Sequence, residues 1–203
     1  MTADKITAEK KEIRKRIKEM RAGLSPDAQR QLSGRIFDRV CAAGLYEDHK
    51  TSFAYMSMPG EVQTRDFMEK AWAGGKRIAV PRTDMKTHEI HFFYIDSFSQ
   101  VRPGVMGIPE PVPETECADE DEDALMIMPG LAFDGDRGRV GYGGGFYDRY
   151  LEKHPGHPTA AVAFDFQIFE KVPSDRHDRR PDFLFTPSGV IARTGPSERL
   201  EDR

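Results

Sequence analysis

The chain has 203 residues, of which 38% are hydrophobic and 32% are charged, and this length suits one domain with a single buried core. Its net charge of −4 is unlike that of a general nucleic-acid binder, which is usually basic. No uncharged stretch approaches the roughly 20 residues that span a bilayer, and no apolar N-terminal stretch precedes a cleavage site. We therefore expect one domain over residues 1–203 that binds neither membranes nor nucleic acid.

The two cysteines, Cys41 and Cys117, form neither a disulfide framework nor a zinc-binding spacing. Two isolated thiols suit a reducing compartment, so we expect a cytoplasmic protein. We also expect a monomer, and a flexible C-terminal tail over residues 194–203.

The first predicted element is a basic helix over residues 5–22. Apolar residues recur on one of its sides at helical spacing, namely Ile6, Ile13, Ile17, Met20 and Leu24. Lys10, Arg14 and Arg21 lie within about 40° of one another at the border of this stripe, so they can reach a cleft. An ordinary solvated helix fits the same pattern, and attachment to RNA or a membrane surface is a third interpretation.

The following elements alternate between helices and strands. Ser25 and Pro26 predict the start of a second helix that runs to about Ala43, and Thr64 is expected to cap a third helix over residues 65–73. Strands are predicted at 51–56, 78–82, 91–95, 124–130 and 159–164, with a last pair at 182–185 and 189–192. The acidic run 114–123 is predicted to be a solvated loop. This order indicates an α/β fold with a mostly parallel sheet, which binds ligands beyond the carboxyl ends of its strands.

The segment 129–151 carries the strongest functional signal. Four glycines, Gly141, Gly143, Gly144 and Gly145, stand between a buried strand and a helix that contains Arg149. Such a loop can turn consecutive amides and a helix N-terminus toward an anion, and flanking arginines would neutralise a phosphate. Asp148 fits there if a divalent cation bridges it to the phosphate. The alternative is a flexible surface loop; the motif matches neither the P-loop nor the dinucleotide fingerprint.

Two further loops hold candidate polar residues. Glu61 stands beside a glycine after the first strand, at the expected ligand edge of the sheet, although a single loop acid is more often structural. The segment 175–180 offers Asp175, His177 or Asp178 to a metal, or is simply a polar loop. No nucleophile elbow and no metal-ligand spacing of histidines is present.

Together these residues resemble the 5-formyltetrahydrofolate cyclo-ligase (methenyltetrahydrofolate synthetase) family, from about Ala8 to Ile191. The most specific piece is MPGLAFD followed by GRVGYGGGFYDRYL, within residues 128–151. Lys10 and Arg14, the loop with Glu61, GIPEP at 107–111 and Asp178 agree in order and spacing.

The resemblance implies a three-layer α/β/α fold and an ATP-dependent ligase that closes 5-formyltetrahydrofolate to 5,10-methenyltetrahydrofolate and releases ADP and phosphate. Magnesium would be held by Asp148 and Asp178, and Arg149 would be catalytic. The nucleotide phosphates would be held by Lys10 and Arg14 and by a phosphate loop over 139–147, that is Arg139, Val140, Gly141, Tyr142, Gly143, Gly144, Gly145, Phe146 and Tyr147. Folate would contact Met56, Glu61 and residues 142–146.

Two positions depart from the family pattern. Phe146 replaces a more common tyrosine, and Met106 stands where an aromatic residue is frequent, so stacking on folate is expected to be weaker there. Two other functions remain open on the residues alone: a non-catalytic nucleotide or phospho-ligand sensor, and an RNA-associated protein that acts through its first helix.

Overall fold

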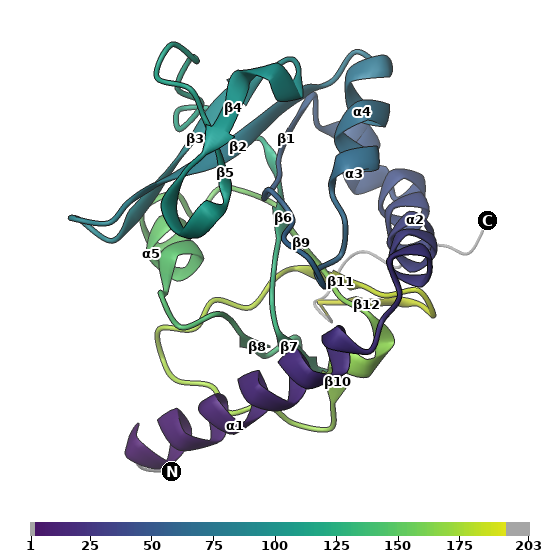
Figure 1. Ribbon diagram of the computed structural model, residues 1–203, viewed down its shortest axis with the longest axis vertical. Coiled ribbons are helices and arrows are strands. Elements are labelled where there is room, and N and C mark those ends of the chain that lie inside the picture. The colour runs from purple at the N-terminus through teal and green to yellow at the C-terminus, as the bar shows by residue number, and fades with distance from the viewer. Residues whose placement is uncertain (1–2, 194–203) are drawn as a thin grey trace.

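A computed structural model describes residues 3–193, and the predicted tail at 194–203 lies outside them. Its main sheet has seven strands in the order β12-β11-β9-β6-β1-β2-β3 (Figure 1). The strands are β1 (Thr51–Phe53), β2 (Arg77–Asp84), β3 (Glu89–Ile95), β6 (Leu125–Met128), β9 (Thr159–Val162), β11 (Phe183–Phe185) and β12 (Val190–Ala192). β11, β9, β6, β1 and β2 run parallel, and the edge strands β12 and β3 run antiparallel. The predicted mostly parallel sheet is confirmed.

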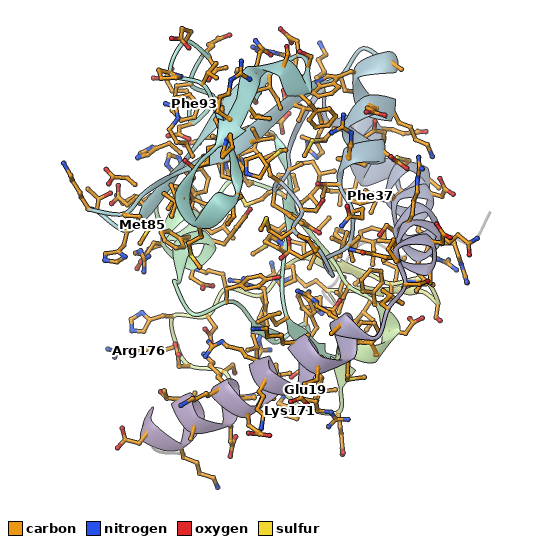
Figure 2. All side chains as sticks on the ribbon, viewed as in Figure 1. Glu19, Phe37, Met85, Phe93, Lys171 and Arg176 are labelled. Carbon is orange, nitrogen blue, oxygen red and sulfur yellow. The ribbon has the colours of Figure 1, made fainter. Side chains whose placement is uncertain are left out.

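Helices cover both faces of this sheet, because alternate strand residues point to opposite sides. Leu125 and Ile127 pack toward α2 (Pro26–Ala42) and α4 (Arg65–Ala73), whereas Met126 and Met128 pack toward α5 (Phe146–Lys153). Figure 2 shows Phe37 on the side of α2 that faces the sheet, where its ring stacks on Phe67. The fold is therefore the expected three-layer α/β/α arrangement.

The basic helix α1 (Ala3–Ala22) belongs to neither layer. It crosses a small second sheet of β7 (Ala132–Asp134), β8 (Arg139–Val140) and β10 (Ile168–Phe169) (Figure 1). Ile17 is fully buried there against Leu131, Ala132 and Val140, whereas Met20 of the predicted stripe is 38% exposed. The face of α1 that turns inward thus includes Lys10, Ile13, Ile17 and Arg21.

The remaining elements are short. They are α3 (Gly44–Asp48), β4 (Val101–Pro103), β5 (Pro109–Pro111) and the 3-10 turns η1 (Phe98–Gln100), η2 (Val105–Gly107) and η3 (Asp165–Gln167). The second helix, predicted to run to about Ala43, ends at Ala42, and after a break at Ala43 the chain begins α3 at Gly44. Within residues 3–193, no helix has the length and apolar character needed to cross a membrane.

Two local predictions are confirmed in position but not in the contacts they implied. Thr64 does precede α4, but its hydroxyl donates to the Tyr55 carbonyl at 2.7 Å and so ties two loops together instead of capping the helix. The acidic run is not simply solvated, because it lies along the edge strand β3. Asp119 accepts from the Phe92 amide at 2.7 Å, and Asp121 accepts from the Tyr94 hydroxyl at 2.7 Å.

Candidate functional site

The site lies where the parallel strands end. The loop after β1 holds Glu61, the loop after β6 holds Gly130, and η3 after β9 holds Gln167. Gln167 is fully buried, and its side-chain amide donates to the Gly130 carbonyl at 3.0 Å and to the Leu131 carbonyl at 2.9 Å. These bonds fix the segment that leads into β7, β8 and the glycine-rich loop.

The glycine-rich loop is shorter than predicted. Arg139 and Val140 belong to β8, and Phe146 and Tyr147 begin α5, so the loop proper is 141–145. The predicted phosphate-binding range 139–147 thus includes the last strand residues before the loop and the first two residues of α5. Gly143 and Gly145 have φ values of 106° and 66°, a region that favours glycine. Gly145 directly precedes the N-terminus of α5, which is the arrangement that suits an anion.

Two arginines hold this loop through its carbonyl groups. Arg14 Nε donates to the Gly141 carbonyl at 2.9 Å, and Arg149 Nη2 donates to the Gly144 carbonyl at 2.6 Å. Arg149 also donates to the His88 carbonyl through Nε at 2.8 Å, which connects the loop to the β2–β3 hairpin. Within the described residues, these contacts do not use the amide groups of residues 141–144, which therefore stay available to an anion.

Arg139 and Asp148 form an ion pair beside the loop. Arg139 Nη2 donates to Asp148 Oδ1 at 2.6 Å, and the same oxygen accepts from the Arg179 amide at 2.9 Å. The side chains are 5% and 20% exposed. The pair brings β8, α5 and the segment that follows Asp178 together, and it leaves Oδ2 of Asp148 outside these bonds.

Lys10 brings the other predicted carboxylate to α1. Its Nζ donates to Asp178 Oδ2 at 2.6 Å and to Asp175 Oδ2 at 3.1 Å, and Lys10 is only 9% exposed. A hydrogen bond from the His177 amide, together with Lys10, lowers the pKa of Asp175. Lys10 and Arg14 therefore face the protein, whereas Lys15 and Lys18 on the same helix are exposed.

Glu61, Tyr142 and Arg21 meet at one point. The Tyr142 hydroxyl donates to Glu61 Oε1, Arg21 Nη1 donates to the Tyr142 hydroxyl at 2.6 Å, and Glu61 Oε2 accepts from the Met58 amide at 2.8 Å. Loss of hydration and the nearby charge of Glu61 raise the pKa of Tyr142. The structure thus joins the predicted folate contact Glu61 directly to the glycine-rich loop.

Four other predicted residues have different surroundings. Tyr147 lies near this group; its hydroxyl is buried without a hydrogen-bond partner among residues 3–193, and burial raises its pKa. Met56 is partly buried and packs against the core that faces α2. Phe146 lies under the Arg149 guanidinium, whose carbon is 5.4 Å from the centre of the ring. Met106 is 86% exposed at the tip of η2, so folate stacking there would need an approach from solvent.

The sequence analysis did not identify Asp134, whose carboxylate holds the backbone that leads into the glycine-rich loop. It is 1% exposed and accepts hydrogen bonds from the amides of Asp136, Gly138 and Val172 at 2.7–3.0 Å. These bonds shape the turn between β7 and β8, which sets the start of the glycine-rich loop. The signal was the sequence Asp-Gly after a strand, since an aspartate that caps its own turn is a frequent hairpin device.

The fold is that of an α/β protein in which a glycine-rich loop precedes a helix N-terminus at the ligand edge of a parallel sheet, an arrangement that suits an anion. The same chain matches the sequence model of one family over residues 6–187. It belongs to the 5-formyltetrahydrofolate cyclo-ligase family.

Similar proteins cover nearly the whole chain. The 5-formyltetrahydrofolate cyclo-ligase of Mus musculus is 27% identical over 198 residues, which cover 90% of this chain and 95% of the mouse protein. The enzyme of that name from Escherichia coli K12 is 28% identical over 178 residues, with coverages of 86% and 98%. The NMR structure of Aquifex aeolicus 5,10-methenyltetrahydrofolate synthetase is 31% identical, with a TM-score of 0.81 and coverages of 95% and 97%.

Proposed function

We propose that this chain catalyses the ATP-dependent cyclisation of 5-formyltetrahydrofolate to 5,10-methenyltetrahydrofolate, with release of ADP and phosphate. Family membership supports this reaction. The observation that carries the proposal is the contact between Tyr142 of the glycine-rich loop and Glu61, because it brings the proposed phosphate and folate sites together.

The nucleotide phosphates would bind to the amides of residues 141–145 and the N-terminus of α5. Lys10, Arg14 and Arg139 supply positive charge around this loop, and its left-handed glycines allow close approach of the backbone. Arg149 would add charge through Nη1, since its contacts to His88 and Gly144 use Nε and Nη2. Positioning and charge are the main requirements of phosphoryl transfer.

The carboxylates present fit a magnesium ion that is shared with a phosphate. Among residues 3–193, no three His, Cys, Asp or Glu side chains gather into a metal cage. Asp148 and Asp178 each bind a cationic side chain through one oxygen, and the Arg179 amide on Asp148 brings the two neighbouring segments together. Magnesium commonly takes one or two carboxylates plus substrate phosphates and water, and it would neutralise phosphate charge here.

Folate would contact Glu61, Met56 and the loop residues 142–146. Glu61 is 7% exposed, so its carboxylate can accept from pterin N–H groups in surroundings with little water. The Met56 thioether and the Phe146 ring supply apolar surface. Loss of the tyrosine hydroxyl at Phe146 leaves the ring contact intact.

The reaction then needs no protein nucleophile. The formyl oxygen attacks the γ-phosphorus and ADP leaves, which converts the formyl oxygen into a good leaving group. The neighbouring folate nitrogen attacks the formyl carbon, loses its proton, and the C–O bond breaks to release phosphate. The basic side chains around the loop would stabilise charge on the transferring phosphoryl group.

The test is a spectroscopic assay for 5,10-methenyltetrahydrofolate with the purified chain, ATP, magnesium and 5-formyltetrahydrofolate. We expect product only when ATP is present, with one ADP per product. Tight ATP binding without product would refute the enzyme and favour a nucleotide sensor. We further propose that the protein is cytoplasmic, because Cys41 and Cys117 are free thiols. We also propose a monomer, which sedimentation at working concentration tests.

A further inference from the structure

Arg21 is buried beside the candidate site but is not among the residues proposed to contact a substrate. It lies in the last turn of α1, and its side chain is only 10% exposed. Nη1 donates to the Tyr142 hydroxyl at 2.6 Å, Nη2 donates to the Gly130 carbonyl at 2.9 Å, and Nη1 lies 3.9 Å from Glu61 Oε1. One guanidinium therefore links α1, the loop after β6, the glycine-rich loop and the Glu61 loop.

The Tyr142 hydroxyl occupies Glu61 Oε1, the carboxylate oxygen on the side of Arg21, with a hydrogen bond. Glu61 Oε1 accepts from Tyr142, while Oε2 is held by the Met58 amide at 2.8 Å. A ligand whose N–H groups bind the Glu61 carboxylate must compete with Tyr142 for Oε1. The Tyr142 residue is 54% exposed, so it has room to leave when that happens.

The backbone around Tyr142 allows such a movement. Gly141 precedes it and Gly143, with φ of 106°, follows it. The backbone is held at Gly141 by Arg14 and at Gly144 by Arg149, whereas Tyr142 between them is held on Glu61 only through its side-chain hydroxyl.

We propose that Arg21 and Tyr142 form a latch that couples the two substrate sites: Arg21 holds the Tyr142 hydroxyl on Glu61, and folate binding replaces that hydroxyl and frees the glycine-rich loop for the nucleotide. The inference rests on the proposed function, because Glu61 must be a folate contact. Arg21 is a positioning residue here, since it acts through Tyr142 and Glu61.

The latch makes a specific thermodynamic statement. If both substrates bind better to the released loop, each must raise the affinity for the other by the same factor. We expect folate to tighten nucleotide binding about tenfold, within the usual range of such couplings. Removing the latch should let each substrate bind alone as tightly as it binds in the presence of the other.

The experiment measures the Kd of a non-hydrolysable ATP analogue with magnesium by calorimetry, without and with saturating 5-formyltetrahydrofolate. In Tyr142→Phe the ratio of the two values should fall from about ten to about one. This variant keeps an exposed ring, so it should fold, whereas Arg21→Met leaves buried Glu61 unpaired. Arg21→Lys keeps the charge but has one nitrogen in place of the two that contact the Tyr142 hydroxyl and the Gly130 carbonyl. We expect an intermediate ratio of the two Kd values for this variant.

Tyr94→Phe is the matched control. It also removes a hydroxyl that donates to a carboxylate, that of Asp121 at 2.7 Å, and it should keep the wild-type ratio. The latch is overturned if the ratio of the two Kd values is unchanged in Tyr142→Phe, or if it is one in the wild type while both ligands bind. Either result leaves the proposed enzymatic function standing. If the wild type binds no folate, the proposed function and the latch both fail.

Discussion

Arg139 and Asp148 form a 2.6 Å ion pair that ties the strand before the glycine-rich loop to the helix after it. The loop is thereby anchored at both ends by one charged contact, nine residues apart in sequence. Because the Arg139 side chain is only 5% exposed, its buried positive charge is compensated by the Asp148 carboxylate. The carboxylate proposed to face magnesium is therefore also part of the framework of the loop.

The Asp148→Asn variant separates these two roles. Its amide oxygen still accepts from Arg139, so we expect a moderate loss of stability, but the charge that would face the metal and phosphate is gone. We expect kcat to fall about 100-fold, a typical loss for one charge-stabilising group. Steady-state kinetics and thermal unfolding measure the two effects. Asp96→Asn, an exposed aspartate, is the control, and an unchanged kcat in Asp148→Asn would disprove the metal assignment.

Gly143→Ala tests the phosphate loop. A side chain at φ of 106° is strained by roughly 1–2 kcal/mol, and it also obstructs the approach of a phosphate to the backbone. Gly75→Ala is the control, because φ there is 76° and a Cβ would meet nothing within 4 Å. Both variants should lose similar stability, but only Gly143→Ala should bind an ATP analogue at least tenfold more weakly. Equal affinities in the two variants would contradict the loop's role.

The sequence predicted those parts of the fold that depend on a few neighbouring residues. Ser25 caps α2 as expected, with its Oγ accepting from the Ala28 amide at 3.2 Å. The second sheet was missed because β8 and β10 have two residues each, too short for any periodicity. Thr64 shows the limit of capping rules, since the Tyr55 carbonyl competes successfully for its hydroxyl.

The candidate site also has parts that a short segment predicts and parts that only the fold creates. The order strand, glycines, helix is contiguous, so the sequence predicted the loop and its anion-binding character. The partners of its charged residues were beyond prediction, because Lys10 and Asp178 are 168 residues apart and only the fold brings them together. The helical wheel placed Arg21 correctly beside Lys10 and Arg14, but no pattern in the sequence pointed to Tyr142 as its partner.

Lys10→Met tests the link between α1 and the 175–178 segment. The change leaves Asp178 without its cation at 2.6 Å, and we expect a loss of about 1–3 kcal/mol in unfolding free energy, the usual result for a charged hydrogen bond. If Lys10 also contacts phosphate, the KM for ATP should rise at least tenfold. Lys11→Met changes the same residue type at an exposed position of the same helix and should do neither. A normal KM with reduced stability would make Lys10 purely structural.

His157 should make stability depend on pH. It is 4% exposed, its Nδ1 donates to the Ala124 carbonyl at 2.9 Å, and its Nε2 is buried without a partner among residues 3–193. A proton on Nε2 would have no acceptor, and burial lowers the pKa of His157 below its ordinary 6.5. The unfolded chain therefore takes up this proton first as the pH falls.

The free energy of unfolding should accordingly be highest above pH 6.5 and fall below it, by up to about 1.4 kcal/mol per pH unit from this one group. The fall continues until the pH reaches the lowered pKa of the folded state. Denaturant unfolding at a series of pH values measures the slope. His157→Gln should flatten it between pH 6.5 and 5, whereas His177→Gln, at an exposed position, should not. The same slope in wild type and His157→Gln would show that the buried imidazole already finds an acceptor for its second proton.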